Sequence, residues 1–185
     1  MRAYEMIIAG FGGQGILFMG QVLAHAANEI GKNVSWLPSY GPEMRGGTAN
    51  CMVCLSDEEI NSPLVLKPNV LVAMNKPSMQ RFQTQLTSGG WLVVNEDMVD
   101  IEPERKDIKV VKVKADTIAA ELKNEKTANM VALGTLIGFT GVISLEDTIK
   151  GFHEMVPPER KNIIPINEAA LKKGFEIGNN ARQEG

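Results

Sequence analysis

Short apolar runs alternate with longer segments of helical periodicity along most of the chain. Residues 6–9 are apolar at every position, which is typical of a strand that is covered on both faces of a sheet. The following segment, residues 16–30, repeats apolar side chains at helical spacing and is followed by Gly31, a residue favoured just past helix C-termini. This strand, turn and helix predict the beginning of a layered α/β fold.

The rest of the chain continues the alternation. Further strands are predicted at residues 33–37, 48–55, 69–74, 91–94 and 108–113. Further helices are predicted at residues 78–86, 117–122, 129–139, 145–155 and 167–177. Pro38 is expected to end the second strand. The order of elements predicts a Rossmann-like three-layer α/β fold with a mostly parallel sheet and a helical C-terminal part, formed as one domain by residues 1–185.

The composition is that of an ordinary globular protein of 185 residues, with 44% hydrophobic and 22% charged residues. Its net charge of -3 lacks the basic excess that nucleic-acid binding requires. No apolar stretch approaches the roughly 20 residues of a membrane span. The N-terminus has no signal-peptide layout, because its short apolar run breaks at glycine. We therefore expect a soluble cytoplasmic chain without nucleic-acid or membrane partners.

A glycine-rich loop lies between the first strand and the first helix. Its spacing, G-x-G-x-x-G, is that of dinucleotide-binding turns, in which bare backbone approaches a pyrophosphate at a helix N-terminus. An NAD site also requires an acidic residue at the end of the second strand, and residues 35–38 contain none; a lysine typical of NTPases is missing as well. A tight turn without ligand, a site for another anion and a partner-binding surface all remain open. The candidate residues are Gly10, Gly12, Gly13, Gln14 and Gly15.

A second loop, around residues 39–50, reads SYGPEMRGGTAN. It follows the second strand, so it is expected at the carboxyl edge of the sheet, beside the glycine loop, where α/β proteins bind ligands. Glycine pairs allow the backbone to approach a ligand or a partner closely. The plainer alternative is a flexible crossover with a solvated Glu and Arg. The candidate interface or access residues are Tyr40, Glu43, Arg45, Gly46, Gly47 and Asn50.

The cysteines and histidines carry the remaining candidate chemistry. Cys51 and Cys54 form a C-x-x-C, but residues three apart in a strand point to opposite faces, so a disulfide or a shared metal is not expected. Two cysteines also fall short of the four thiolates usual for an iron–sulfur cluster. His25 lies among apolar residues of the first predicted helix and is expected to pack or to form an interface. His153 lies in a late predicted helix and has no Asp or Ser constellation that would support catalysis. We expect no catalytic residue and no metal site on this chain.

Five segments in one order carry a family resemblance: residues 10–15 (GFGGQG), 39–50, 59–65 (EINSPLV), 69–75 (NVLVAMN) and 129–134 (NMVALG). Together they resemble the gamma subunit of 2-oxoacid:ferredoxin oxidoreductases, over about residues 5–177. The form MRGGTAN at residues 44–50 is similar to the 2-oxoglutarate and branched-chain 2-oxoacid types.

The resemblance implies a non-autonomous subunit of an enzyme that oxidatively decarboxylates a 2-oxoacid with coenzyme A. The products are an acyl-CoA and CO2, and the electrons pass to an external ferredoxin. Thiamine diphosphate, Mg2+ and iron–sulfur clusters would belong to alpha, beta and delta (ferredoxin-like) subunits, with no cofactor held by this chain alone. The two loops would shape the coenzyme A entrance and a subunit interface. The alternative is a free-standing coenzyme A- or nucleotide-binding module.

Overall fold

The computed structural model describes residues 3–41 and 46–184. The strands are β1 (Tyr4–Phe11), β2 (Asn33–Tyr40), β3 (Thr48–Ser56), β4 (Val70–Ala73), β5 (Trp91–Asn95) and β6 (Lys109–Val113). The helices are α1 (Ile16–Glu29), α2 (Lys76–Phe82), α3 (Ala115–Glu121), α4 (Ala128–Thr140), α5 (Leu145–Met155) and α6 (Ile164–Glu184). Every predicted strand and helix is present, and α6 extends beyond its predicted limits at both ends.

The six strands form one sheet in the order β2-β3-β1-β4-β5-β6. Strands β1, β4, β5 and β6 pair in parallel, whereas β3 is antiparallel to both of its neighbours, β1 and β2. Only β3 therefore runs against the other strands, and the predicted mostly parallel sheet is confirmed. The insertion of β3 between β1 and β2 was not predicted. The hydrophobic pattern of a chain encodes neither the order of the strands in a sheet nor their direction.

Pro38 does not end the second strand, so that prediction was wrong. Strand β2 continues through Pro38, which lies opposite Cys51 of β3, and ends at Tyr40. The reason is the position of β2 at the edge of the sheet, where it pairs with β3 alone. An edge strand tolerates proline, because the proline nitrogen, which has no N–H to donate, can face the open side of the strand, where no partner strand needs a hydrogen bond.

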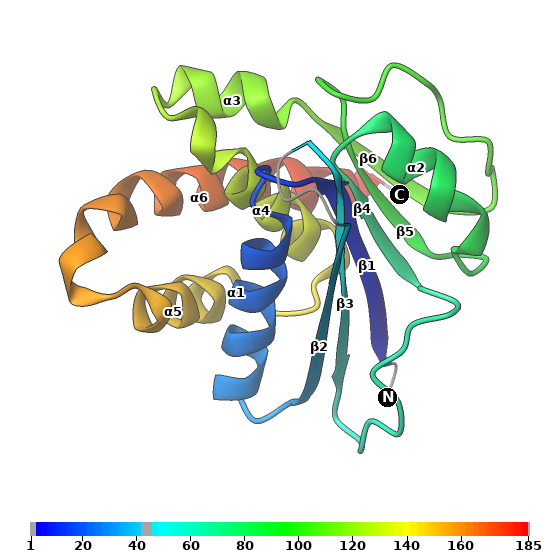
Figure 1. The fold of residues 1–185 in the computed structure, drawn as a ribbon, viewed down its shortest axis with the longest axis horizontal. Coiled ribbons are helices and arrows are strands. Elements are labelled where there is room, and N and C mark those ends of the chain that lie inside the picture. The colour runs from blue at the N-terminus through cyan, green and yellow to red at the C-terminus, as the bar shows by residue number, and fades with distance from the viewer. Residues whose placement is uncertain (1–2, 42–45, 185) are drawn as a thin grey trace.

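Helices cover both faces of the sheet, which confirms the three-layer arrangement (Figure 1). One face packs against α1, α4 and α6, with α5 outside α1; the thinner layer on the other face contains α2 and the segments leading to β4 and β6. Strand β1 supplies both layers in alternation: Met6 and Ile8 join the first core, Ile7 and Ala9 the second. None of the helices within the described residues has the length and apolar character needed to cross a membrane.

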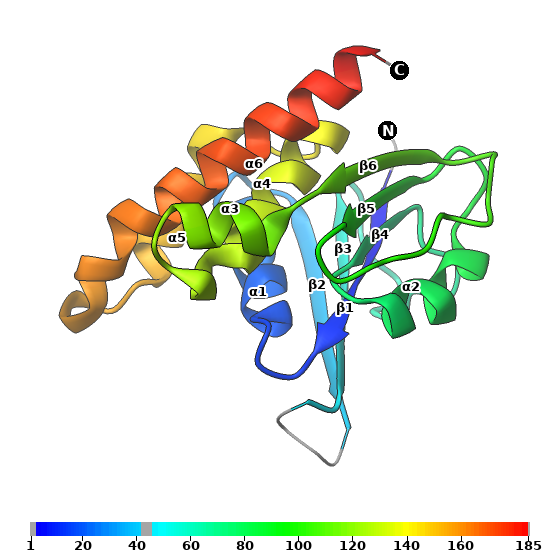
Figure 2. The same ribbon diagram turned by 90° about the horizontal axis from the view of Figure 1, so that it is seen from above.

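The most extensive helix–helix contact among the described residues joins α4 and α6. All residues of α4 are buried, and it packs between the sheet and α6 (Figure 2). Glycines line the contact on both helices. A Cβ on Gly174 would lie 1.9 Å from the carbonyl oxygen of Val131, and one on Gly134 would lie 2.1 Å from that of Leu171. The two helical backbones thus touch directly, and no side chain fits between them.

The cysteines lie on opposite faces of β3, as strand alternation predicted. Cys51 is buried in the core beside α1, and its Sγ donates to the carbonyl oxygen of Ile16 at 3.7 Å; Cys54 belongs to the core beside α2. Burial raises the pKa of the Cys51 thiol to about 12 and that of Cys54 to about 11. Both side chains are therefore neutral, buried thiols that cannot share a metal ion.

We predict that Gly174→Ala destabilises the chain by about 1–3 kcal/mol, because the backbone of α4 must move away from the added methyl group. Helix propensity alone predicts the opposite sign, a gain of about 1 kcal/mol. Urea denaturation measures the difference. Asn180→Ala, on the exposed face of the same helix, is the control and is expected to raise stability by at most about 0.7 kcal/mol, through helix propensity alone. A Gly174→Ala variant as stable as the parent would contradict the direct backbone contact.

We also predict that both thiols resist modification in the folded chain. At pH 8 a maleimide should label Cys51 and Cys54 more slowly than in the unfolded chain by roughly three orders of magnitude or more, because labelling requires opening reactions that cost about 5 kcal/mol or more. Mass spectrometry of the labelled protein, with and without denaturant, measures both rates. Rapid labelling of the native chain at either cysteine would contradict the buried positions.

Candidate functional site

The glycine loop and the second loop meet at the carboxyl end of β1. The amide of Gly12 donates to the carbonyl oxygen of Gly47 at 2.8 Å, and the amide of Gly46 donates to that of Gly12 at 3.3 Å. The predicted adjacency is confirmed. Strand β2 runs in the same direction as β1, so both strands end at this edge, as expected, and β3 returns from it as the antiparallel neighbour of both. The bonds of Gly12 with Gly46 and Gly47 continue the ladder of β1 and β3 into the loops.

The side chain of Gln14 holds the glycine loop together from inside. Its Oε1 accepts from the amide of Phe11 at 2.7 Å, and its Nε2 donates to the carbonyl oxygen of Met74 at 3.2 Å. A Cβ on Gly10 would lie 2.6 Å from both Gln14 Oε1 and Ile16 Cδ1. Gly10 therefore leaves room for the glutamine, and both the oxygen and the nitrogen of the Gln14 side-chain amide are hydrogen-bonded within the fold.

Gly15 also has a structural role. It has a φ of +72°, and a Cβ there would lie 2.4 Å from Nδ2 of Asn129. The same Nδ2 donates to the carbonyl oxygen of Gly15 at 3.3 Å, joining the start of α1 to the start of α4. Sequence reasoning missed the role of Asn129, although the residue begins one of the five characteristic segments. A contact over so long a separation has no local signal in the pattern.

Gly13 and Gly46 differ from Gly10 and Gly15 because both face open space among the described residues. Both are exposed and have positive φ angles, +103° and +75°, and no atom of residues 3–41 and 46–184 lies within 4 Å of a Cβ built on either residue. Their lack of a side chain is thus required by backbone conformation and leaves the surface in front of the loops clear. These are the positions at which a ligand or a partner can approach the backbone.

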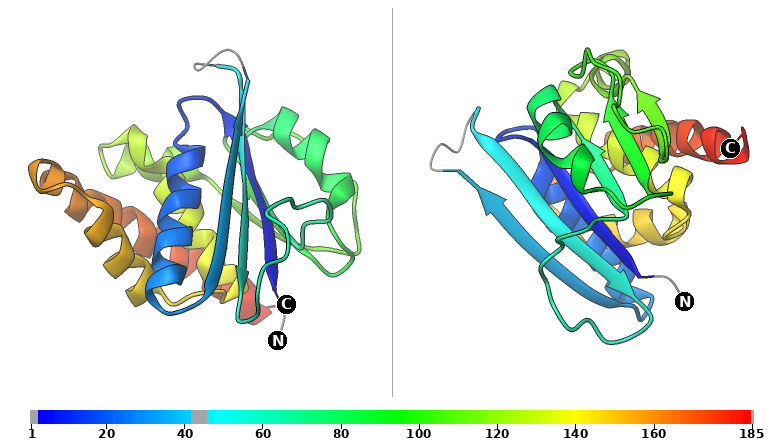
Figure 3. Two further views of the ribbon diagram at one scale, coloured as in Figure 1. Left: turned by 60° about the horizontal axis from the view of Figure 1, so that its bottom comes forward. Right: turned by 90° about the vertical axis from the view of Figure 1, so that its right-hand side faces the viewer.

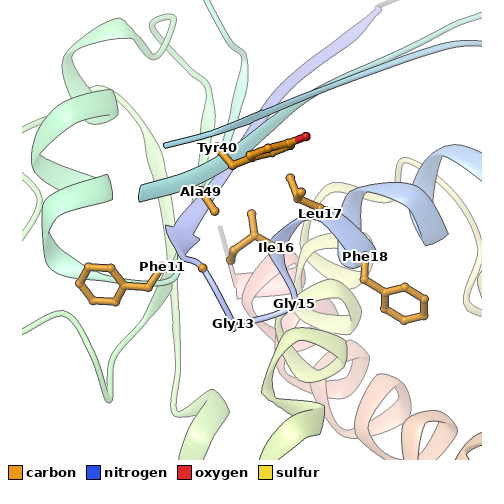
Figure 4. Close-up of a pocket in the computed structure, with 9 residues that line it drawn as sticks. Phe11, Gly13, Gly15, Ile16, Leu17, Phe18, Tyr40 and Ala49 are labelled. Atoms are coloured by element: carbon orange, nitrogen blue, oxygen red, sulfur yellow. The ribbon is translucent and has the colours of Figure 1, made fainter. Parts of the chain in front are cut away.

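A cavity of about 510 Å³ lies between the glycine loop, the start of α1 and the end of β2. Figure 4 shows Ile16, Leu17 and the ring of Tyr40 beside it, whereas the rings of Phe11 and Phe18 turn away to either side. Tyr40 is 63% exposed and presents a large apolar ring to the solvent. The described lining residues carry no charge: Phe11, Gly12, Gly13, Gly15, Ile16, Leu17, Phe18, Tyr40 and Ala49.

The structure gives a second reason for the poor match to an NAD site. In a dinucleotide-binding fold the ribose carboxylate follows a strand that lies parallel to and beside the first. Here the strand beside β1 on that side is β3, which runs in the opposite direction, and β2 is one position further away. The end of β2 thus could not have supplied that carboxylate in the usual position.

Three further candidates from the second loop have different outcomes. Asn50 lies within β3, 8% exposed, and not in the loop itself. Glu43 and Arg45 lie outside the described residues.

Asparagines at the ends of β4 and β5 complete the carboxyl edge and were not singled out from the sequence. Asn75 Oδ1 accepts from the amide of Ser78 at 2.9 Å, which caps α2. Asn95 Oδ1 accepts from the amide of Ala115 at 3.2 Å, and its Nδ2 donates to Asp116 Oδ2 at 2.6 Å. An asparagine directly after a buried strand and before a helix is the signal that could have identified Asn75. The Oδ1 atoms of both asparagines and Nδ2 of Asn95 are thus used within the fold.

The two histidines lie away from both loops. His25 Nε2 is 3.4 Å from Glu154 Oε2, which links α1 to α5, and His153 Nε2 is 2.5 Å from Glu168 Oε1, which links α5 to α6. Glu29 lies near His25, so that three potential ligand atoms fall within 4.8 Å of one another. This group is at the C-terminal end of α1, whereas the glycine loop is at its N-terminal end. Both histidines thus join neighbouring helices through contacts with glutamates, at a distance from the two loops.

Known proteins similar to this chain include whole subunits and part of a longer one. The chain is 38% identical to ketoisovalerate oxidoreductase subunit VorA of Methanothermobacter marburgensis, over 95% of this chain and 36% of VorA. It thus spans about a third of that relative's length. It is 41% identical to 2-oxoglutarate synthase subunit KorC of the same organism, over 94% of this chain and 95% of KorC.

A solved structure has the same fold over nearly its full length. The gamma subunit of a keto/oxoacid ferredoxin oxidoreductase from Geobacter sulfurreducens superposes with a TM-score of 0.86 at 30% identity, covering 98% of this chain and 99% of that one. A family model described as pyruvate ferredoxin/flavodoxin oxidoreductase matches residues 5–177, the region over which the resemblance was predicted. The chain therefore belongs to the pyruvate ferredoxin/flavodoxin oxidoreductase family.

Proposed function

We propose that this chain is the gamma subunit of a 2-oxoacid:ferredoxin oxidoreductase that acts on 2-oxoglutarate or a branched-chain 2-oxoacid. The observation that carries the proposal is the 41% identity to KorC, a 2-oxoglutarate synthase subunit, which extends along nearly all of both chains. Similarity to VorA, a ketoisovalerate oxidoreductase subunit, supports the branched-chain alternative. The whole chain would act as one domain of a cytoplasmic complex that forms an acyl-CoA and CO2.

The two loops at the end of β1 are proposed to line the coenzyme A entrance and to contact a partner subunit. The cavity beside exposed Tyr40 has no charge among its described lining residues, which suits apolar contact with a partner side chain or a thioester arm. Gly13 and Gly46 leave the backbone in front of it accessible. The side-chain amides of Gln14 and Asn129 already form hydrogen bonds within the chain. The surface would therefore recognise a ligand or a partner through its shape and its exposed backbone rather than by acid–base chemistry.

The chemistry of the reaction is proposed to lie on alpha, beta and delta subunits, which would hold thiamine diphosphate, Mg2+ and iron–sulfur clusters. This chain's thiols do not fit an iron–sulfur cluster, because Cys51 and Cys54 are buried on opposite faces of β3. External ferredoxin would accept the electrons. Coenzyme A would be a substrate that passes the loops of this chain.

Affinity purification of the tagged chain from its native source tests the proposal. Native mass spectrometry should find it with thiamine- and iron–sulfur-containing chains. The purified assembly should reduce ferredoxin only when a 2-oxoacid and coenzyme A are both present, and comparison of 2-oxoglutarate with ketoisovalerate identifies the substrate. Recovery of the chain alone, in a form that binds coenzyme A or a nucleotide, would favour the free-standing module instead.

We predict that Gly46→Asn lowers the coenzyme A-dependent activity of the assembled enzyme at least about tenfold, a loss of about 1.4 kcal/mol, while the melting temperature of the chain stays unchanged. Asparagine tolerates the left-handed backbone, and no atom of the described residues lies within 4 Å of a Cβ added at Gly46. Gly89→Asn is the matched control: its φ is +71° against +75° for Gly46, and its surroundings are equally open. Equal activity of the two variants would place the second loop outside the functional surface.

Arg45→Ala gives a second, sequence-based test of the same loop. The melting temperature of the free chain should stay nearly constant, since an exposed ion pair contributes about 0–1 kcal/mol. In the assembled enzyme, loss of an arginine held against a partner carboxylate or a coenzyme A phosphate should reduce binding or turnover roughly 30- to 4000-fold. Acyl-CoA formation measured across coenzyme A concentrations decides the matter, and wild-type kinetics would make Arg45 a solvated bystander.

A further inference from the structure

A second cavity of about 510 Å³ lies at the opposite end of the sheet from the two loops. Tyr4, Trp91 and Lys109 begin β1, β5 and β6, so the cavity adjoins the amino ends of the parallel strands. The C-terminal ends of α4 and α6 complete it. Figures 2 and 3 show the end of α6 and the start of β1 on the same side of the molecule. The lining residues are Tyr4, Trp91, Lys109, Val110, Phe139, Thr140, Ala181 and Arg182.

Aromatic rings form part of the cavity wall. The ring centroids of Tyr4 and Trp91 lie 5.9 Å apart with an interplanar angle of 35°. The Tyr4 hydroxyl donates to the carbonyl oxygen of Thr140 at 3.4 Å, which fixes the ring against the end of α4. Phe139 contributes a third ring to the lining. A planar, apolar group of a ligand can stack against such a preformed surface at a low cost in conformational entropy.

The charged groups of the lining are both positive. Lys109 and Arg182 are exposed, and neither takes part in an ion pair within residues 3–41 and 46–184. The Arg182 guanidinium lies against Gly141, since a Cβ there would be 2.0 Å from Nη1. Gly141, with a φ of +67° at the end of α4, thus leaves the space that positions the guanidinium. No carboxylate among the described lining residues opposes the two cations.

We propose that this cavity binds a nucleotide, with the base against Tyr4 and Trp91 and the phosphates held by Lys109 and Arg182. The volume falls within the range of roughly 300–1,000 Å³ typical of small-molecule sites. Aromatic walls suit a planar base, and paired cations without a local carboxylate suit phosphate oxygens. Since the chain as a whole has a net charge of -3, the positive charge of Lys109 and Arg182 is a local feature of this cavity. The site is separate from the proposed coenzyme A entrance and does not depend on it.

Two sources supply the same chemistry, a free nucleotide and the adenine nucleotide of coenzyme A. Calorimetry of the full chain at low ionic strength should therefore compare ADP, coenzyme A, adenosine and pyrophosphate. We expect ADP or coenzyme A to bind at least about tenfold more tightly than either adenosine or pyrophosphate, because only the nucleotides engage the rings and the cations together. Whichever of the two binds more tightly identifies the source.

Variants locate the binding. Lys109→Gln and Arg182→Gln should each weaken nucleotide binding at least about tenfold, whereas Lys106→Gln, an exposed lysine outside the lining, should leave it unchanged. In a Trp36→Phe background, Trp91 is the remaining tryptophan and its fluorescence should change on binding. Melting temperatures verify that each variant is folded. If one variant does not fold, the comparison of the four ligands on the parent chain still tests the proposal.

Three results would overturn the proposal. The first is the lack of binding of both nucleotides at millimolar concentration. The second is pyrophosphate or adenosine binding as tightly as ADP and coenzyme A. The third is nucleotide binding that neither Lys109→Gln nor Arg182→Gln weakens and that leaves the Trp91 fluorescence unchanged, which would place the ligand elsewhere on the chain.

Discussion

The burial of β1 on both faces and along both edges is the constraint on which the rest of the structure depends. Residues 6–9 are fully buried, and β1 pairs with β3 on one side and with β4 on the other. A strand in this position must send alternate apolar side chains into two cores, and those cores require helices on both faces. The same strand delivers the glycine loop to one end of the sheet and Tyr4 to the other.

The loops that follow β1 are stabilised mostly by the protein itself. Gln14 and Asn129 use their amide groups within the fold, and Asn75 and Asn95 do the same at the ends of neighbouring strands. Among the described residues of the loops, backbone is exposed at Gly13 and Gly46, beside a cavity whose described lining carries no charge. Such a surface suits recognition of another molecule more than bond-making chemistry, which agrees with a family in which this chain corresponds to one subunit or to one part of a longer chain.

The two ends of the sheet have different chemistry for a topological reason. At the carboxyl end, asparagines and glycines that build turns into helices dominate, and the described cavity lining is uncharged. At the amino end, α4 and α6 finish beside β1, β5 and β6, and their last residues bring aromatic rings together with two cations. The direct contact of α4 with α6 fixes that second arrangement, because glycines on both helices allow the backbones to touch.

The sequence by itself determined the elements, the covered strands and the position of the glycine loop, because apolar period and turn residues act locally. It also predicted that Cys51 and Cys54 would separate, since strand alternation needs only adjacent residues. Tertiary structure alone decided the reversal of β3, the passage of β2 through Pro38 and the contact of Gly15 with Asn129. Each of these depends on which segments become neighbours. The hydrophobic pattern along the chain does not indicate the direction of a strand or its position at the edge of a sheet. It also does not identify contacts between distant residues, such as Asn129 and Gly15, which are 114 positions apart.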